Sequence, residues 1–390
     1  MSLNAHPLPP RLTSPARLYF LDNLRIAAFA VLVIYHVGMY YVTWDFHVKS
    51  PFASQAAEPW MTLSSPWRMS LLFMVSGAAT ALMLRAGASN ELLRTRTKRL
   101  LWPLVFGMMV IVPPQTYFEV IHKFQFSGDY LDFLKIYFSH HPGLRYADFC
   151  QGKKCLILPT WNHLWFLPYL WTYTAVLWLM VKLRPNLLSP ILLERSIFAK
   201  IQGIWLLIVP VLGLVLLRWA LAARFPQTHA FADDWFLHPM YFAMFLTGAI
   251  IVNLPGHWQK IERLRWIALV LALIAWATLV LFYQLLGPVW RRIDVSIQQW
   301  CALVAAFGFA YRHWNHDHAW RARLTEAVFP VYILHQTIII LLTQALLPIA
   351  WRPAIEAPVV IATTFLLSYV GYEVLRRITL LRPAFGMPKL

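Results

Sequence analysis

The sequence is poor in charged residues, and poorest in acidic ones. Only 13% of its 390 residues are charged, with 17 Asp and Glu against 34 Lys and Arg, whereas 59% are hydrophobic. A soluble domain is about half apolar and about a quarter charged. The composition therefore excludes a soluble globular protein and predicts an all-α polytopic membrane protein. The formal net charge of +17 then indicates basic loops beside anionic lipid in a bilayer, and we expect no nucleic acid partner.

Cysteine is equally scarce, with three residues in the whole chain. Cys150 and Cys155 lie in "FCQGKKC" between apolar segments, and Cys301 lies within one. The first two can form a disulfide if their loop faces an oxidising compartment. A metal site is disfavoured because two ligands do not complete a tetrahedron. We expect no metal and no permanently bound cofactor.

Runs of roughly 17–25 apolar residues predict about ten membrane spans. The predicted ranges are 20–43, 67–86, 100–120, 161–182, 202–222, 236–254, 266–286, 295–311, 324–350 and 357–376. With the N-terminus in the cytoplasm, cytoplasmic segments hold about twice as many Lys and Arg as the opposite side. Both termini are therefore expected to be cytoplasmic. Residues 1–16 are proline-rich and polar, which indicates a disordered cytoplasmic tail and no cleavable signal peptide.

The first predicted span carries Asp22, Arg25 and His36. At 3.6 residues per turn these three side chains fall within about 60° of one another, so they share a face that we expect to point into the bundle. Asp22 and Arg25 can pair at i,i+3. His36 is expected near mid-bilayer, about 15 Å above the charged end at a rise of 1.5 Å per residue. Histidine titrates near neutral pH and suits a general base, although a histidine bonded across helices for packing alone is the alternative.

Arginines lie near the ends of the second and third predicted spans. Arg68 stands near the outer end of the second span, where it either reaches the membrane interface or has a functional role. Arg96 and Arg99 lie in "RTRTKRLLWPL" at the inner surface before the third span. They are either an ordinary basic loop or a cationic cradle for a polyanionic ligand such as the phosphates of coenzyme A.

Two further histidines lie on other predicted spans. His163, in "WNHLWFLPYLW", taken alone indicates anchoring at the membrane interface. His335, in "FPVYILHQTIIILL", shares a helical face with Tyr332 and Gln336. Histidines near mid-depth on three separate helices are hard to explain by packing alone.

The chain resembles the transmembrane acyltransferase 3 family, and within it the branch involved in glucan biosynthesis. The matching segments are "RLYFLDNLRIAAFAVLVIYHVGMYYVTWDFHVKS", "WRMSLLFMVSG", "RTRTKRLLWP", "HLWFLP", "FPVYILHQ" and "YEVLRRITLLRPAFGMPK". The first segment is quite specific; the others are weak singly but occur in the family's order. Many members read Leu-Asp-Gly-Leu-Arg-Gly where this chain has Asn23 and Ile26 in place of the glycines, which favours the glucan branch.

This resemblance implies a multi-pass enzyme of the bacterial inner membrane, with residues 17–390 forming a single transmembrane acyltransferase domain. It implies that the enzyme transfers an acyl group, succinyl, to hydroxyls of a periplasmic glucan. The donor implied is a cytosolic acyl-CoA, succinyl-CoA. The bilayer and the glucan-synthesis machinery are the further partners to expect. The family's site residues match these positions here: His36, Asp22 and Arg25 as the catalytic set, and Arg96, Arg99, His163 and His335 as residues of the donor and substrate sites.

The mechanism expected from these residues leaves two routes open. His36 removes the proton from a glucan hydroxyl, or it takes the acyl group itself and passes it on. Asp22 and Arg25 would shape the donor entrance. A succinyl carboxylate buried without a partner is costly, so Arg68 or His335 is expected to pair with it.

Three other functions compete with this one. The first is O-acetylation of another extracytoplasmic glycan. The second is a proton-coupled transporter, for which paired repeats and helices interrupted at matching positions are typical, and neither is visible in the sequence. The third is a non-catalytic scaffold in glucan assembly. The aromatic and basic segment 121–160 could form a lid or an interfacial segment in any of them.

Overall fold

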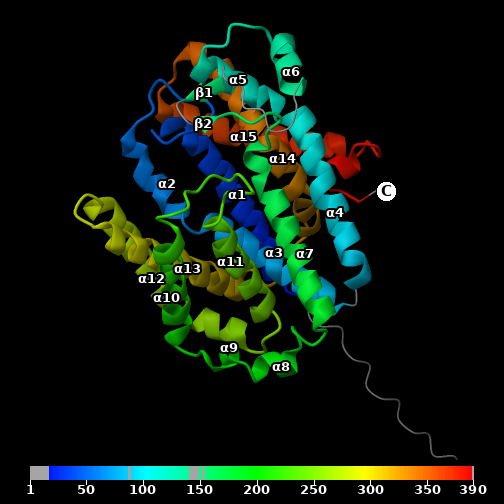
Figure 1. The fold of residues 1–390 in the computed structure, drawn as a ribbon, viewed down its shortest axis with the longest axis vertical. Helices are drawn as coiled ribbons and strands as arrows, with labels where there is room; N and C mark the ends of the chain where they lie inside the picture. The colour runs from blue at the N-terminus through cyan, green and yellow to red at the C-terminus, as the bar shows by residue number, and fades with distance from the viewer. Residues whose placement is uncertain (1–16, 87–88, 140–148, 152–153, 389–390) are drawn as a thin grey trace, which may run out of the picture.

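The computed structural model describes residues 17–86, 89–139, 149–151 and 154–388 of the chain. Residues 1–16, for which we expect a tail, lie outside these ranges. Nearly all of the described chain is helical, and the long helices pack side by side as one bundle (Figure 1). A single buried hydrophobic cluster contains residues from Phe20 to Met387, so the two ends of the described chain belong to one core.

The helices in chain order are α1 (Tyr19–Tyr41), α2 (Glu58–Ser64), α3 (Arg68–Arg85), α4 (Ser89–Phe106), α5 (Pro113–Phe124), α6 (Tyr130–Phe138), α7 (Phe166–Leu183), α8 (Pro190–Glu194), α9 (Ile197–Lys200), α10 (Trp205–Leu221), α11 (Leu237–Ile251), α12 (His257–Phe282), α13 (Pro288–His313), α14 (Arg321–Leu346) and α15 (Pro353–Leu375). A π-helical turn, Gly107–Ile111, joins α4 to α5, and 3-10 turns cover Gln55–Ala57, Asn162–Trp165, Leu347–Ile349 and Arg382–Phe385. Strands β1 (Cys150–Gln151) and β2 (Lys154–Cys155) form an antiparallel pair.

A helix occupies each of the predicted spans. Within the described chain, 7 helical segments are long and apolar enough to cross a membrane. An eighth is possible if α4 and α5, which meet at an angle of 49°, form one broken span. This bend follows from Pro113 and Pro114, which have no backbone N–H to continue the helix. Helices α10 and α11, with 17 and 15 residues, are shorter. The structure confirms a helical multi-pass membrane protein, with 7 or 8 spans supported by length and composition.

Helices α3 and α11 approach each other more closely than side chains would allow. A Cβ atom added at Gly77 would lie 1.8 Å from the carbonyl oxygen of Phe245, and one at Gly248 would lie 1.9 Å from that of Met74. Only glycine fits at both positions, as is usual where membrane helices pack backbone to backbone.

A small cap covers the end of the bundle where α1 ends, with α5, α6 and the β1–β2 pair at the top of Figure 1. A disulfide joins Cys150 to Cys155 across this pair. The hydroxyl of Tyr137, on α6, donates to the carbonyl of Met108 at 2.8 Å. The described part of segment 121–160 is thus packed onto the helices; residues 140–148 and 152–153 lie outside the described chain.

Candidate functional site

The structure brings the three predicted histidines together. The ring centroids of His36, on α1, and His335, on α14, lie 5.0 Å apart. The ring of His163, in the turn before α7, lies 5.1 Å from that of His335. His163 is only 5% exposed, so the interpretation of this residue as an anchor at the membrane interface is wrong. The burial of His163 could not be predicted from the sequence, because the turn that carries it folds inward before α7 begins.

The hydrogen bonds of these rings determine which nitrogens carry protons. Nδ1 of His335 lies 2.6 Å from the carbonyl oxygen of Tyr332, which can only accept, so this nitrogen carries the proton. In the neutral ring Nε2 is then an acceptor. Nδ1 of His36 lies 2.9 Å from this atom and donates to it. In the neutral ring of His36, Nε2 is then the unprotonated nitrogen, the form that a general base requires.

His36 lines a cavity of about 350 Å³ at the end of the bundle where α1 ends. The cavity walls combine aromatic, amide and imidazole side chains with the guanidinium of Arg68. They include Tyr35, Ser65, Arg68, Gln227, Tyr241 and Tyr332. A pocket with a few converging polar groups on largely apolar walls is the usual form of a small-molecule site. His36 therefore faces a space that a substrate can occupy, and it does not face lipid.

Arg68 stands over the face of Tyr35, with its guanidinium carbon 3.3 Å from the ring centroid. Its Nη1 atom donates to the carbonyl oxygen of Ser65 at 3.2 Å. Arg68 makes no ion pair with any residue of the described chain. A guanidinium on the wall of a cavity without a counter-charge is suited to bind an anionic group.

Arg25, Arg96 and Arg99 line a second cavity, of about 210 Å³, near the opposite end of α1. Each arginine donates a hydrogen bond to a neutral group. Arg25 donates to the carbonyl of Thr325 at 3.0 Å, and Arg96 donates to the hydroxyl of Thr80 at 3.2 Å. Arg99 donates to the carbonyl of Gly386 at 3.2 Å. Within the described residues none of these arginines has an ion-pair partner. Glu326 also lines the cavity, but it pairs with Arg382 at 3.2 Å. The cavity therefore presents three guanidinium groups whose charges are available to a polyanion.

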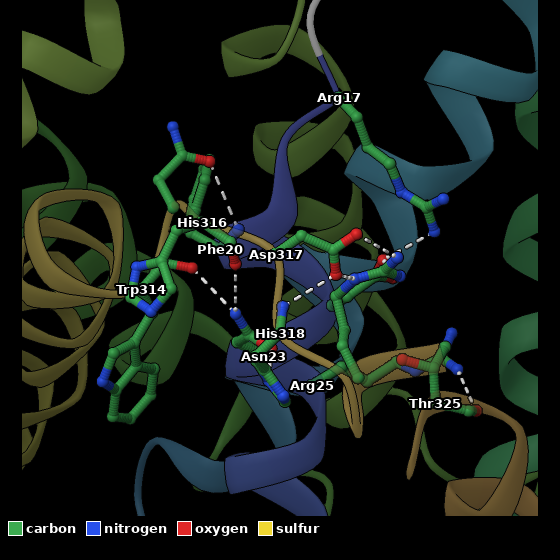
Figure 2. Close-up of polar contacts among 12 residues, drawn as sticks. Arg17, Phe20, Asn23, Arg25, Trp314, His316, Asp317, His318 and Thr325 are labelled. Atoms are coloured by element: carbon green, nitrogen blue, oxygen red, sulfur yellow. Dashed lines mark hydrogen bonds and ion pairs between the residues drawn. The ribbon is translucent and has the colours of Figure 1, made fainter. Parts of the chain in front are cut away.

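Asp22 does not pair with Arg25, so that prediction is wrong. The Asp22 carboxylate accepts from Arg17 and from Arg321, at 3.0 Å each. Figure 2 shows Arg25 directed toward Thr325 and not toward Arg17. Arg321, whose side chain is 7% exposed, is bracketed by Asp22 and Asp317. A buried guanidinium needs a compensating charge. The Asp22 carboxylate therefore pairs with Arg321 and not with Arg25, its i,i+3 neighbour.

The three predicted residues of α1 nevertheless face the same helix. Asp22 contacts Arg321, Arg25 contacts Thr325 and His36 contacts His335, all on α14. The shared helical face expected from the sequence is confirmed. Asn23 extends this contact, since its amide donates to the carbonyl of Trp314 at 2.8 Å and its side-chain oxygen lies 3.0 Å from Nε2 of His318 (Figure 2).

The substitution Asp22→Asn tests whether this residue is structural. We expect it to lower the free energy of unfolding by about 1.5–3 kcal/mol, the contribution typical of a hydrogen bond to a charged group. The rate of turnover per folded molecule should change little, because the Asp22 carboxylate touches neither cavity described above. Thermal unfolding in detergent, with the exposed Asp233→Asn as control, measures the first effect. A normal melting temperature with lost turnover would contradict this assignment.

An aromatic layer separates the two cavities. Phe29, Phe166 and Phe329 line the cavity that holds Arg25, Arg96 and Arg99, which we call the arginine cavity. Tyr332 lines the cavity that holds His36, which we call the histidine cavity. The three phenylalanine ring centroids lie 5.4, 6.3 and 6.0 Å from that of Tyr332. Arg25 and His36 are about 16 Å apart along α1 at a rise of 1.5 Å per residue. A molecule that engages both ends must pass through this layer.

Sequence reasoning missed Gln115, at the start of α5. Its amide nitrogen donates to Thr337 at 2.6 Å and lies 3.4 Å from Nδ1 of His163. Its amide oxygen accepts from Asn162 and Gln336, at 3.1 Å each. Gln115 thereby ties α5, α14 and the His163 turn together. The available signal was a glutamine directly after Pro113-Pro114 inside an apolar run.

The histidines have the geometry of a hydrogen-bonded relay, not of a metal centre. No group of His, Cys, Asp and Glu side chains in the described ranges could hold a metal ion. The facing nitrogens of His36 and His335 are 2.9 Å apart, which leaves room for a shared proton only.

Comparison with known proteins identifies the family of this chain. Residues 18–373 match the acyltransferase domain family. Over 178 residues, 44% of this chain, the sequence is 26% identical to Glucans biosynthesis protein C of Escherichia coli strain SMS-3-5 / SECEC and 25% identical to the same protein of Escherichia coli O1:K1 / APEC. That match spans 41% of the length of each relative. No solved structure matches the chain. The family match covers nearly the whole described chain, and the protein therefore belongs to the acyltransferase domain family.

Proposed function

We propose that this protein transfers an acyl group, succinyl, from cytosolic acyl-CoA to hydroxyl groups of a periplasmic glucan. The observation that carries the proposal is the 2.9 Å contact of Nδ1 of His36 with His335 on the wall of the histidine cavity, which leaves Nε2 of the neutral His36 ring free to take up a proton. The family match supports acyl transfer, and the name of the Escherichia coli relatives supports a glucan as acceptor. In the bacterial inner membrane we place the arginine cavity toward the cytoplasm, with ten crossings that include α10 and α11 and both termini inside.

In the proposed reaction the acceptor hydroxyl enters the histidine cavity from the periplasmic side. Nε2 of His36 takes the hydroxyl proton while the acceptor oxygen attacks the thioester carbonyl carbon. The carbon–sulfur bond breaks, the ester forms, and the thiolate leaves with the proton carried by His36. Transfer through an acylated His36 uses the same nitrogen and is the alternative route. Throughout, Nδ1–H of His36 keeps its bond to His335, which fixes the orientation of the ring.

The donor is expected to bind with its phosphates among Arg25, Arg96 and Arg99. Guanidinium groups bind phosphate oxygens through charge-assisted, often bidentate hydrogen bonds. From there the thioester arm must pass Phe29, Phe166, Phe329 and Tyr332 to reach His36. The aromatic layer would then keep water and protons from crossing when no donor is bound.

The cation for the succinyl carboxylate is Arg68 in this proposal. His335 was the other candidate from the sequence, but it is 0% exposed, and both of its ring nitrogens are engaged by Tyr332 and His36. We therefore assign His335 to positioning His36.

His163, whose Nε2 lies 3.1 Å from the carbonyl of Ile333, is assigned to the wall that supports His335.

The substitution Arg68→Gln separates succinyl from acetyl transfer. Loss of a charge-assisted hydrogen bond costs about 1.5–3 kcal/mol, so we expect succinyl transfer to fall about tenfold to a hundredfold. Acetyl transfer, which needs no cation, should be nearly unchanged. Initial rates with succinyl-CoA and acetyl-CoA on the same acceptor measure the ratio, and the exposed Arg224→Gln serves as control. Equal loss of both activities would contradict the assignment.

Two measurements test the function itself. Purified protein in lipid nanodiscs should transfer labelled succinyl from succinyl-CoA to a soluble β-glucan, and mass spectra of periplasmic glycans should lose a succinyl increment when the gene is deleted. An acetyl increment instead would favour O-acetyl transfer. Solute flux without acyl turnover would favour a transporter, and unchanged decoration in a His36→Ala strain would favour a scaffold.

A further inference from the structure

A third cavity, of about 560 Å³, adjoins the histidine cavity at the same end of the bundle. Ser65, Gln227 and Tyr241 line both, so the two spaces share a wall. Its other walls include residues of α2, α10, α11, α12 and α13. A ligand longer than one small group could occupy both cavities together.

A buried cation lines this third cavity. Arg218, on α10, is 7% exposed. Its guanidinium donates to the hydroxyl of Ser296 at 3.2 Å and to the side-chain oxygen of Gln299, both neutral. Arg218 has no ion-pair partner in the part of the chain that the structure describes. Glu58, the one carboxylate on these walls, accepts from Thr43. The positive charge of Arg218 is therefore left without a counter-charge.

An unused acceptor lies on the same wall. Gln298 is 1% exposed, and its amide nitrogen donates to the carbonyl of Thr62 at 2.9 Å. Its amide oxygen is buried and has no hydrogen-bond partner. Buried polar atoms are normally paired, so this oxygen indicates a missing donor such as a sugar hydroxyl. Trp44 and Tyr283 add aromatic surface to the cavity.

We infer that this third cavity binds an anionic substituent, a carboxylate or a phosphate ester, on the sugar chain whose hydroxyl is acylated in the adjoining cavity. Arg218 pairs with the anion, and the Gln298 oxygen accepts from a hydroxyl of the same chain. The inference rests on the proposed function. A succinyl group already added to the glucan supplies such a carboxylate, so the protein would favour acceptors that it has already modified.

The first test uses the unaltered protein in nanodiscs with two acceptors, a neutral glucan and the same glucan carrying succinyl groups. We expect a KM about tenfold to a hundredfold lower for the succinylated glucan, the range set by one charge-assisted hydrogen bond. The difference should shrink as salt is added. Equal KM values would overturn the inference while leaving the proposed function intact. Absence of transfer to either acceptor would instead count against the proposed function.

The second test is Arg218→Gln, with the exposed Arg224→Gln as matched control. The variant should lose the preference for the succinylated glucan and keep its rate on the neutral one, which also shows that it folds. Acceptors carrying a phosphate ester in place of succinyl distinguish the two anions. If the variant affects both acceptors alike, and only in bilayers that contain anionic lipid, Arg218 binds a lipid headgroup and the inference is wrong.

Discussion

Replacing His36 with glutamine is expected to lower the rate of acyl transfer by about 10²–10⁴-fold, the usual contribution of a positioned general base. Glutamine keeps a polar side chain of similar length but has no nitrogen that takes up a proton near neutral pH. The bundle should remain folded, because the ring of His36 has only one side-chain hydrogen bond, to His335. The measurement is single-turnover transfer from acyl-CoA in nanodiscs, with the exposed His313→Gln as control.

The neighbouring histidine gives the matched comparison. His335→Gln should also slow transfer, but combining it with His36→Gln should add little further loss, because residues that act as one unit are not additive. Full activity of His36→Gln would contradict a catalytic role for this ring. Additive losses would show that His335 acts independently of His36.

The second large effect is expected at the arginine cavity. Arg96→Gln combined with Arg99→Gln should raise the KM for acyl-CoA about a hundredfold to ten-thousandfold, because each removes a charge-assisted hydrogen bond of about 1.5–3 kcal/mol. The rate at saturating donor should change much less, since neither residue reaches the histidine cavity. Arg94→Gln is the matched control, because Arg94 lies on the same helix, is exposed and does not line the cavity.

A donor analogue makes this prediction specific. If the arginines bind phosphates, a donor that lacks the 3′-phosphate should bind weakly to the unaltered protein. Its affinity for the double variant should be only slightly lower. An equal loss for both donors would show that the arginines act on folding or on another part of the donor. In that case the arginine cavity would not be the phosphate site.

The positions of buried ionisable groups could be inferred from sequence because of their cost in a bilayer. Charged or polar side chains at membrane depth must face the bundle interior, so periodicity alone placed Asp22, Arg25 and His36 on one face. The same argument placed Tyr332 and Gln336 beside His335. These contacts depend on helix geometry, which the spacing along one chain segment determines.

Partners supplied by distant segments could not be inferred in the same way. Asp22 binds Arg321 and not Arg25, because α14 brings a buried guanidinium to the start of α1. His163 is buried because its turn folds inward, and Gln115 reaches it only through the bend at Pro113. Arg218 carried no sequence signal, since a single arginine near the end of an apolar run is typical of a helix terminus. Its isolation from counter-charge is visible only once α10 and α13 are packed together.

The most direct measurement is the ¹⁵N NMR spectrum of histidine-labelled protein in lipid, with His36→Gln to assign the ring of His36 by difference. We expect the tautomer with a proton on Nδ1 and an unprotonated Nε2, and a shift of the Nε2 resonance when an acceptor analogue enters the histidine cavity. A proton on Nε2 of the neutral ring, or a resonance that no acceptor analogue perturbs, would contradict this expectation.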